Sequence, residues 1–349
     1  MTQTNETKPR VFSGIQPTGR KTLGNYSGGF RQYVQTQEQG DALFCIVDLH
    51  SISVEYDPAT LRSQTLDLAA MLFATGLDPE RSIVFSQSHV TAHAEAAWLL
   101  SAVTSHGQLG RMTQFKEKSA SQEFVSAALF TYPVLMAGDI LLYQTDLVPI
   151  GDDQRQHLEL TRDVAQRFNY RFGETFKVPE GVYPEVGGRI MDLQEPTNKM
   201  STTTSSEQGA VYIVDAPDTI RKKFKSAVTD SGKEVRYDPE EKPGIANLIE
   251  ILNVASGEPI DAIEARFDGQ GYGVFKEAVG EAVVDLLTPI RERYEALRAD
   301  ERELQLLLAV GAEKARRAAE PTLEAMYERM GFAKAEAGKH FGVARPRGL

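Results

Sequence analysis

The chain has 349 residues, a single cysteine and a formal net charge of −11. Hydrophobic residues make up 41% and charged residues 25%, a balance that is typical of globular proteins and excludes a disordered chain. The acidic excess also excludes nucleic-acid binding through bulk positive charge, so any such contact requires local basic patches. Cys45 alone can form neither an internal disulfide nor a Cys-ligated metal site, which favours a reducing cytoplasm. The chain contains no apolar run of about 18 residues and no visible secretory signal, so we expect no membrane contact.

The first part of the sequence alternates short apolar runs with longer helical patterns. Three runs are predicted strands: Val11–Gly14, Ala42–Val47 and Ile83–Phe85. Asn25–Gln37 has helical spacing, and Asp57-Pro58 predicts the start of a second helix that ends near Gly76. Repetition of strand, helix and strand predicts an α/β fold with a parallel sheet.

The character of the sequence changes at Asn198–Gly209, where Ser and Thr residues predict a mobile loop. Beyond this loop, apolar residues recur at helical spacing almost to the end of the chain. We therefore predict a parallel-sheet α/β domain over residues 1–204. Residues 205–349 are predicted to form a mostly α-helical domain.

Two separate segments have features of a phosphate site. Thr22-Leu23-Gly24-Asn25 opens a helix, whose free N–H groups and dipole attract anions, and Gly24 lets a phosphate approach the backbone. Far downstream, Lys199 is followed by hydroxyl residues and can bring a positive charge to a polyphosphate. Each segment alone is also typical of an ordinary turn or an exposed loop.

Asp139 interrupts an apolar helix predicted over Pro133–Tyr143, where a buried carboxylate is costly without a donor. Two interpretations stay open: an acid on the helix surface or paired with an arginine, and an acid that accepts a hydrogen bond from a substrate N–H group. His50 ends a predicted strand, where ligands gather in parallel sheets. His89 and His93 have the i, i+4 spacing of metal ligands, but no third ligand accompanies them, so we expect no metal site.

The two phosphate-site segments together resemble the paired HIGH-like and KMSKS-like signatures of class I aminoacyl-tRNA synthetases. The segments between them are similar to those of the tryptophanyl-tRNA synthetase family, and the similarity extends from about Val11 to beyond Lys314. The motifs that carry it are Ser13–Gly19, Arg111–Lys118, Tyr132–Leu141, Pro149–Gln154, Gln156–Arg162 and Gly188–Met191.

This resemblance implies a two-step reaction. ATP, accompanied by Mg²⁺, would activate L-tryptophan to tryptophanyl-adenylate, and the tryptophanyl group would then pass to tRNA(Trp). No enzyme nucleophile is needed, so catalysis would come from positioning and from cations near the growing negative charge. The family also implies that residues 1–204 form a Rossmann-like catalytic domain with a connective insertion at about 86–145. It further implies a homodimer formed through the catalytic domains, and anticodon recognition by the helical part over residues 205–349.

The resemblance assigns roles to individual residues on the amino-acid side of the site. Asp139 would accept the indole N–H, and Tyr132 and Gln154 would hold the substrate ammonium group. Gln16 and His50 would line the amino-acid site. Five apolar residues could form the walls around a flat ring, although each alone is equally typical of core packing: Phe12, Val47, Met136, Ile140 and Val148.

The nucleotide would lie between Thr22–Asn25 and the Lys199 loop. Thr22, Asn25, Lys118 and Lys199 are the predicted catalytic residues, the two lysines stabilising the departing pyrophosphate. Asn25 and Lys199 are also predicted ATP contacts. The remaining predicted ATP contacts are Gln16, Thr18, Gly24, Gly151, Asp153, Gln154, Ile190, Met200 and Ser201.

The sequence departs from the family pattern at Thr202 and Thr203, where lysine and serine usually follow Lys-Met-Ser. One phosphate-facing cation is therefore missing, and we hypothesise that Arg20 and Lys21 compensate for it. Two alternatives remain: tyrosine activation on the same scaffold, which the Met-x-x-Asp pattern at Asp139 disfavours, and a paralogue with weak charging activity that binds tryptophan or a partner protein.

Overall fold

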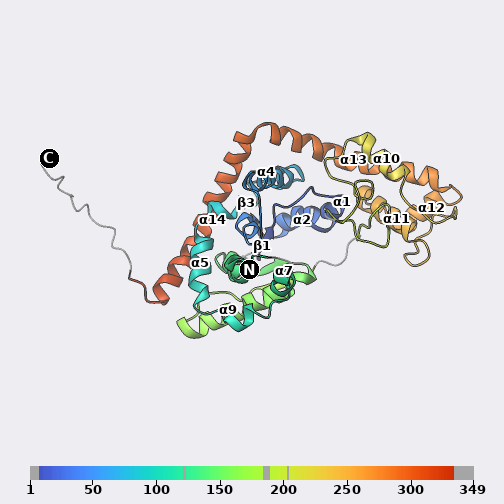
Figure 1. The fold of residues 1–349 in the computed structure, drawn as a ribbon. Coiled ribbons are helices and arrows are strands. Elements are labelled where there is room, and N and C mark those ends of the chain that lie inside the picture. Colours follow the sequence, from blue (N-terminus) through green and yellow to red (C-terminus); the bar gives the residue numbers. More distant parts are fainter. Residues whose placement is uncertain (1–7, 121–122, 184–188, 203, 334–349) are drawn as a thin grey trace, which may run out of the picture.

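The computed structural model describes residues 8–120, 123–183, 189–202 and 204–333 and contains a five-stranded parallel sheet surrounded by helices (Figure 1). The strand order is β3-β2-β1-β4-β5. The strands are β1 (Arg10–Ile15), β2 (Asp41–Ile46), β3 (Ile83–Ser86), β4 (Leu147–Pro149) and β5 (Glu180–Val182). The three predicted strands are confirmed as β1, β2 and β3, and their parallel pairing confirms the predicted α/β fold. The two short strands β4 and β5 were not among the predicted elements.

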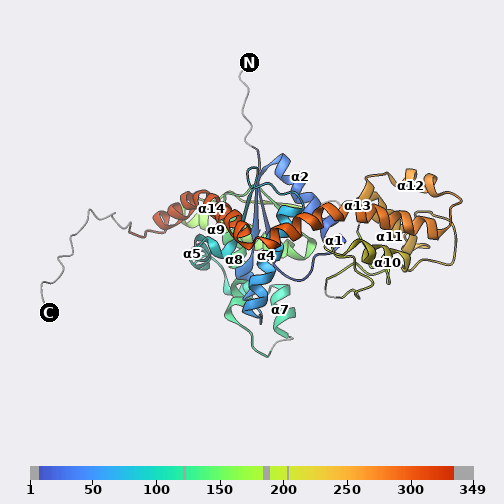
Figure 2. The ribbon, with the colours of Figure 1, turned by 90° about the horizontal axis from the view of Figure 1, so that it is seen from above.

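Helices cover both faces of the sheet (Figures 1 and 2). Nine of the described α-helices belong to this part of the chain, and the short ones among them include α1 and α3, which follow strands β1 and β2. The helices of this part are α1 (Leu23–Asn25), α2 (Arg31–Gln39), α3 (Asp48–Ser51), α4 (Pro58–Ala74), α5 (Ala92–Ser101), α6 (His106–Leu109), α7 (Thr113–Ala120), α8 (Ala127–Leu141) and α9 (Arg155–Phe172).

Side chains of β2 alternate between two hydrophobic clusters, as the two-residue period of a strand requires. Phe44 and Ile46 pack in the cluster that includes α4, whereas Leu43 and Cys45 pack in the cluster that includes α5, α8 and α9. All of these side chains are buried, which explains why the predicted strand is a continuous apolar run.

Local signals of the sequence account for several element ends. The Asp57 carboxylate caps α4 by accepting a hydrogen bond from the Thr60 N–H at 2.7 Å, and Pro58 occupies the first turn. Gly76 follows the helix with a φ of +117°, a conformation that favours glycine. The helix predicted over Asn25–Gln37 is interrupted by a π-helical turn at Tyr26–Phe30 before α2.

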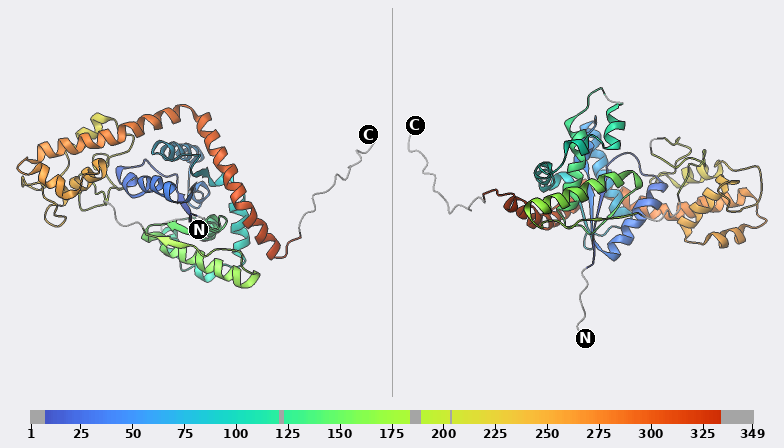
Figure 3. Two further views of the ribbon diagram at one scale, coloured as in Figure 1. Left: turned by 180° about the vertical axis from the view of Figure 1, so that it is seen from behind. Right: turned by 90° about the horizontal axis from the view of Figure 1, so that it is seen from below.

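The second part of the chain is mostly helical, as predicted. Its helices are α10 (Pro217–Lys225), α11 (Pro243–Ser256), α12 (Ile260–Phe267), α13 (Tyr272–Ala299) and α14 (Glu301–Arg329). Helices α10, α11 and α12 lie to one side of the sheet, whereas α13 runs from them to α4 and α14 continues along the sheet (Figures 1 and 3). At Gly311 a Cβ atom would lie 1.8 Å from the carbonyl oxygen of Val84, so α14 packs directly on β3. The domain division at 204/205 stays a prediction.

No helix in the described part of the chain combines the length and the apolar character that crossing a membrane requires.

Candidate active site

A cavity of about 750 Å³ opens at the carboxyl ends of the parallel strands. Gln16 follows β1, His50 follows β2, and Ile150 and Gly151 follow β4, so the cavity lies where ligands bind in open α/β sheets. Helices α7 and α8 close its sides with Lys118 and with several side chains of the Tyr132–Ile140 segment.

All ten residues predicted for the tryptophan site line this cavity. The apolar ones are Phe12, Val47, Met136, Ile140 and Val148, and the polar ones are Gln16, His50, Tyr132, Asp139 and Gln154. These apolar residues also belong to the hydrophobic core or pack against it, so the same side chains both line the cavity and fill the core. The role of each residue towards a ligand stays a prediction.

Asp139 is buried on α8, with only 2% of its surface exposed, and accepts three hydrogen bonds. Its Oδ1 atom lies 2.6 Å from Gln87 Nε2 and 2.6 Å from His93 Nδ1, and its Oδ2 atom lies 2.8 Å from His50 Nε2. Burial raises the pKa of the Asp139 carboxyl, but the hydrogen bonds of His50 and His93 outweigh it and hold that pKa well below its usual range. Asp139 is therefore an ionised acceptor inside the cavity wall, neither a surface acid nor the partner of an arginine.

Gln87 and His93 were not predicted as site residues. His93 bridges Asp139 and the Tyr143 hydroxyl, which lies 2.8 Å from His93 Nε2, whereas His89 is exposed. The two histidines therefore have different surroundings: His89 lies on the turn before α5, and His93 lies buried on α5. Among the residues that the structure describes, no group of three or more His, Cys, Asp or Glu side chains could hold a metal ion.

A second polar cluster surrounds Tyr132, which lies two turns before Asp139 on the same helix, α8. Its hydroxyl lies 2.7 Å from His157 Nε2 and donates to Gln114 Oε1 at 3.2 Å. Burial, reinforced by the charge of Asp153, raises the pKa of Tyr132 to about 12. Burial and the charge of Lys118 lower the pKa of His157 to about 4, so this histidine is neutral at pH 7. His157 was missed as a site residue although it lies within a family-like motif, because nothing in its sequence context marks it.

Several of the residues predicted to bind the nucleotide line one of three hollows. Gly151, Asp153, Gln154 and Lys118 line the main cavity, and Gln154 Nε2 donates to Asp153 Oδ2 at 2.7 Å. Thr18 lines an adjoining hollow of about 260 Å³ that shares Gln16, His50 and Lys118 with the main cavity. Lys199 and Ser201 line a separate hollow within the second signature loop, so the structure does not bring them into the main cavity.

The side chains of Thr22 and Asn25 bond to each other. Thr22 Oγ1 accepts from the Asn25 N–H at 3.3 Å, and Asn25 Oδ1 accepts from the Thr22 N–H at 2.9 Å, which is a capping box at the start of α1. The predicted catalytic pair thus has a structural role in opening the helix. A Cβ atom at Gly24 would lie 3.6 Å from the Met200 carbonyl oxygen, so the two signatures meet at this glycine.

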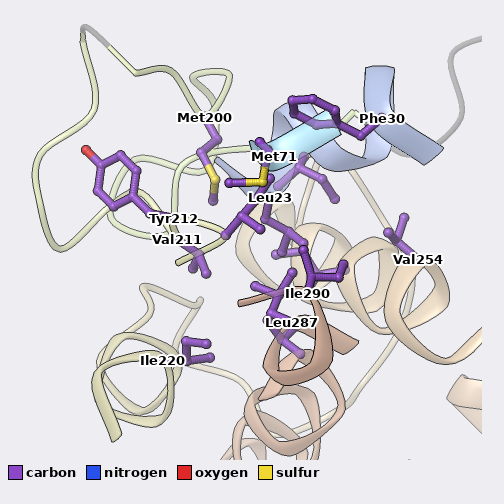
Figure 4. Packing of buried hydrophobic residues seen from close by; sticks show 14 of the residues in the cluster. Leu23, Phe30, Met71, Met200, Val211, Tyr212, Ile220, Val254, Leu287 and Ile290 are labelled. Carbon is purple, nitrogen blue, oxygen red and sulfur yellow. The ribbon is translucent and has the colours of Figure 1, made fainter. Parts of the chain in front are cut away.

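The side chains of Ile190 and Met200 both belong to a hydrophobic cluster, and Figure 4 shows Met200 beside Met71 and Leu23. Each side chain is at most 3% exposed, and the Met200 N–H donates to the Ile190 carbonyl. Their predicted contact with the adenine stays a prediction, and with these side chains buried it would fall to the backbone. The second signature is anchored by burying its methionine. Gly188, the first residue of the Gly188–Met191 motif, lies outside the described residues.

Arg20 and Lys21 were hypothesised to replace a missing phosphate-facing cation. The guanidinium of Arg20 instead pairs with Glu207 at 3.1 Å and Asp215 at 3.3 Å. Lys21 Nζ donates to the Thr18 carbonyl at 2.6 Å and to the Gln16 carbonyl at 3.3 Å. Burial lowers the pKa of Lys21 to about 8. The charge of Arg20 is therefore paired with protein carboxylates, whereas Lys21 bonds to the backbone of Gln16 and Thr18, residues that line the two adjoining hollows.

Comparison with known proteins decides the family. Residues 4–288 match the family model of class I tRNA synthetases for tryptophan and tyrosine, and a tryptophan–tRNA ligase from Listeria monocytogenes is 52% identical over 94% of this chain and 98% of its own length. The chain belongs to the tryptophan–tRNA ligase family. The tryptophanyl-tRNA synthetase structure from Campylobacter jejuni with ADP and tryptophan is similar at a TM-score of 0.82 and 34% identity, over 93% of this chain and all of that one. The Mycoplasma pneumoniae enzyme has a TM-score of 0.81 at 37% identity, over 94% of this chain and 99% of that one.

The second signature is the segment in which this chain departs from the family pattern given above. Thr202 stands where the family pattern has a lysine, and its hydroxyl donates to the Arg20 carbonyl at 3.1 Å. Thr203 lies outside the described residues.

Proposed function

We propose that this chain activates L-tryptophan with ATP and transfers the tryptophanyl group to tRNA(Trp). The observation that carries this proposal is the cavity at the carboxyl ends of the strands, with the ionised carboxylate of Asp139 in its apolar wall. A carboxylate has about four acceptor positions, and three of those of Asp139 are taken by Gln87, His93 and His50. The fourth position is available for an indole N–H.

Selectivity would follow from this buried acceptor. A ring without an N–H group would leave the fourth acceptor position unpaired inside the pocket, which costs more than a lost apolar contact. Met136 and Val148 would contact the faces of the indole. Tyr132 and Gln154 would hold the ammonium group, and the neutral His157 beneath Tyr132 would keep that hydroxyl oriented without adding a positive charge.

In the first step the tryptophan carboxylate oxygen would form a bond to the α-phosphorus of ATP as the bond to pyrophosphate breaks. Lys118, which lines the cavity, and Lys199 of the second signature would stabilise the charge on the leaving pyrophosphate. Mg²⁺ would accompany the triphosphate and shield its charge. It would bind phosphate and water oxygens, since no cluster of acidic or His ligands forms in the described parts of the chain.

In the second step a ribose hydroxyl of the terminal adenosine of tRNA(Trp) would attack the activated carbonyl, and AMP would leave. The helical part has two clusters of basic residues, Arg221–Lys225 and Lys314–Arg317. Arg221 pairs with Glu281 and Lys223 is buried against Asp215, while Arg316 and Arg317 pair with Glu313. Lys222 and Lys225 are exposed on α10 and are the best candidates for phosphate contacts.

We also propose a homodimer formed through the connective insertion. Trp98, the single tryptophan of the chain, lies on α5 with 80% of its surface exposed, which is unusual for so large an apolar side chain. Sedimentation of the unchanged chain and of Trp98→Glu tests this, and a monomer in the first case contradicts it. The free Cys45 thiol is buried, in keeping with the cytoplasmic location that we infer.

Aminoacylation of tRNA(Trp) with tryptophan, tyrosine and phenylalanine in parallel tests the proposed function. Charging with tryptophan alone is expected. Charging with tyrosine would support the tyrosyl alternative, whereas tight tryptophan binding with negligible transfer would support the paralogue that the Thr202 departure keeps open.

A further inference from the structure

Arg20 joins the first signature to both flanks of the second signature loop. Its carbonyl accepts a hydrogen bond from Thr202 Oγ1 at 3.1 Å. Its guanidinium pairs with Glu207, five residues further along the loop, at 3.1 Å. The same guanidinium pairs with Asp215, beyond the loop, at 3.3 Å. One residue of the first turn therefore contacts three points on the far segment.

One of the two acids around this guanidinium, Asp215, is itself held in place. Asp215 is buried, and its second oxygen accepts from Lys223 Nζ at 2.7 Å and from the Tyr212 N–H at 3.0 Å. The Arg20 Cζ atom lies 3.6 Å from the centre of the Tyr212 ring. A planar guanidinium can stack on this ring and bond two carboxylates at once, which the point charge of a lysine cannot do.

The backbone contact is equally close. Gly19 has a φ of +60°, and a Cβ atom there would lie 2.4 Å from the Thr202 methyl group. The first turn and the second signature thus touch, and no side chain fits at Gly19 while Thr202 keeps its place. The lysine of the family pattern could not keep this contact at position 202.

We propose that Arg20 is a positioning residue that fixes Lys199–Thr202 against the first signature, replacing the lysine that the second signature lacks. A lysine at position 202 could be drawn to the triphosphate by its own charge, whereas a threonine needs a protein contact to hold its place. Arg20 would act through Lys199 and would not touch the phosphates. The inference rests on the proposed function for its kinetic consequence but not for its structural one.

Arg20→Gln tests this inference by tryptophan-dependent ATP–pyrophosphate exchange, which requires no tRNA. We expect kcat to fall about tenfold, because small misplacement of a catalytic group lowers rates steeply, while KM for tryptophan stays within about twofold. The matched control is Arg236→Gln, since both arginine side chains are 51% exposed and pair with two acids, Arg236 with Glu234 and Asp238. This control is expected to leave kcat unchanged.

Two further variants separate positioning from direct phosphate contact. Glu207→Gln should also lower kcat. The double variant with Arg20→Gln should lower kcat by less than the product of the two single fold reductions. Arg20→Lys should stay at least about threefold slower than the unchanged chain. Full activity of Arg20→Lys, or independent effects of Arg20→Gln and Glu207→Gln, would overturn the inference.

Amide hydrogen exchange over residues 198–202, measured without substrate, gives a readout that does not depend on activity. Faster exchange in Arg20→Gln than in Arg236→Gln is expected. Equal exchange rates in the two variants would overturn the positioning role of Arg20 even if the proposed function holds. If the unchanged chain does not charge tRNA(Trp) with tryptophan, that result contradicts the proposed function alone.

Discussion

The amino-acid end and the nucleotide end of the site are built differently. Asp139 on α8 and its three partners, His50 on α3, His93 on α5 and Gln87 just after β3, are all buried, with every bond between 2.6 and 2.8 Å. The two signatures meet through loops, and one of their links, Arg20 to Glu207, joins side chains that are 51% and 67% exposed. In the proposed function, selectivity would therefore come from a buried, hydrogen-bonded wall, whereas phosphate chemistry would depend on segments held by contacts that solvent reaches.

The largest expected effect comes from breaking the rigid end. Asp139→Ala removes the proposed indole acceptor and leaves Gln87, His93 and His50 without their common partner. We expect kcat/KM for tryptophan to fall by about a thousandfold or more in pyrophosphate exchange. Asp163→Ala, which removes an exposed acid of α9 bonded to Gln108, is the control. Undiminished preference for tryptophan over tyrosine in Asp139→Ala would refute the assigned role.

On the nucleotide side, Lys118→Ala should lower kcat by about 10²–10³ with little change in KM for tryptophan, because its charge acts mainly as pyrophosphate leaves. Lys116→Ala is a matched control, since Lys116 is exposed on the same helix but does not line the cavity. Equal losses in the two variants would mean that the charge of α7 acts at long range and that Lys118 has no specific role.

The polar cluster at Tyr132 predicts a pH effect on stability. His157 is held neutral, with its pKa lowered from 6.5 to about 4, so between these values the unfolded chain binds a proton that the folded chain does not. The free energy of unfolding should therefore fall as the pH drops from 6.5 to 4.5, by about 2–3 kcal/mol from this group.

Urea denaturation at both pH values checks this effect. His157→Gln should lose the corresponding part of the pH dependence, and His89→Gln, which changes an exposed histidine, should retain it. If the two variants follow the same pH profile, His157 is not the group responsible.

The smallest effect is expected at the loop. Thr202→Lys restores the cation of the family pattern but breaks the hydrogen bond to the Arg20 carbonyl and the contact with Gly19. We expect kcat for charging of tRNA(Trp) to fall by about two- to tenfold, the range that one lost hydrogen bond explains. A clear gain in rate would show instead that the missing charge limits this chain.

The same contrast explains what the sequence could predict. Asp139 stands out as an acid in an apolar helix, and the cavity walls come from strand ends and α8, whose periodicity is readable. Gln87 and His93 reach Asp139 only through the fold, and the spacing of His93 from His89 gave no indication of this contact. Met200 was assigned to a nucleotide, but loop residues have no periodic pattern that tells which side chain turns inward.

The short strands β4 and β5 were missed for a related reason. Each has three residues, and β4 ends in a proline, so neither has enough alternation to mark a strand.

The packing of α14 on β3 has a consequence for synthesis of the chain on the ribosome. β3 is the outer strand on its side of the sheet, and Gly311 brings a helix backbone against its carbonyl groups. Until the last part of the chain emerges, this strand remains a bare edge that can pair with other nascent chains. A truncation before α14 should therefore promote aggregation even though every residue of the cavity is still present.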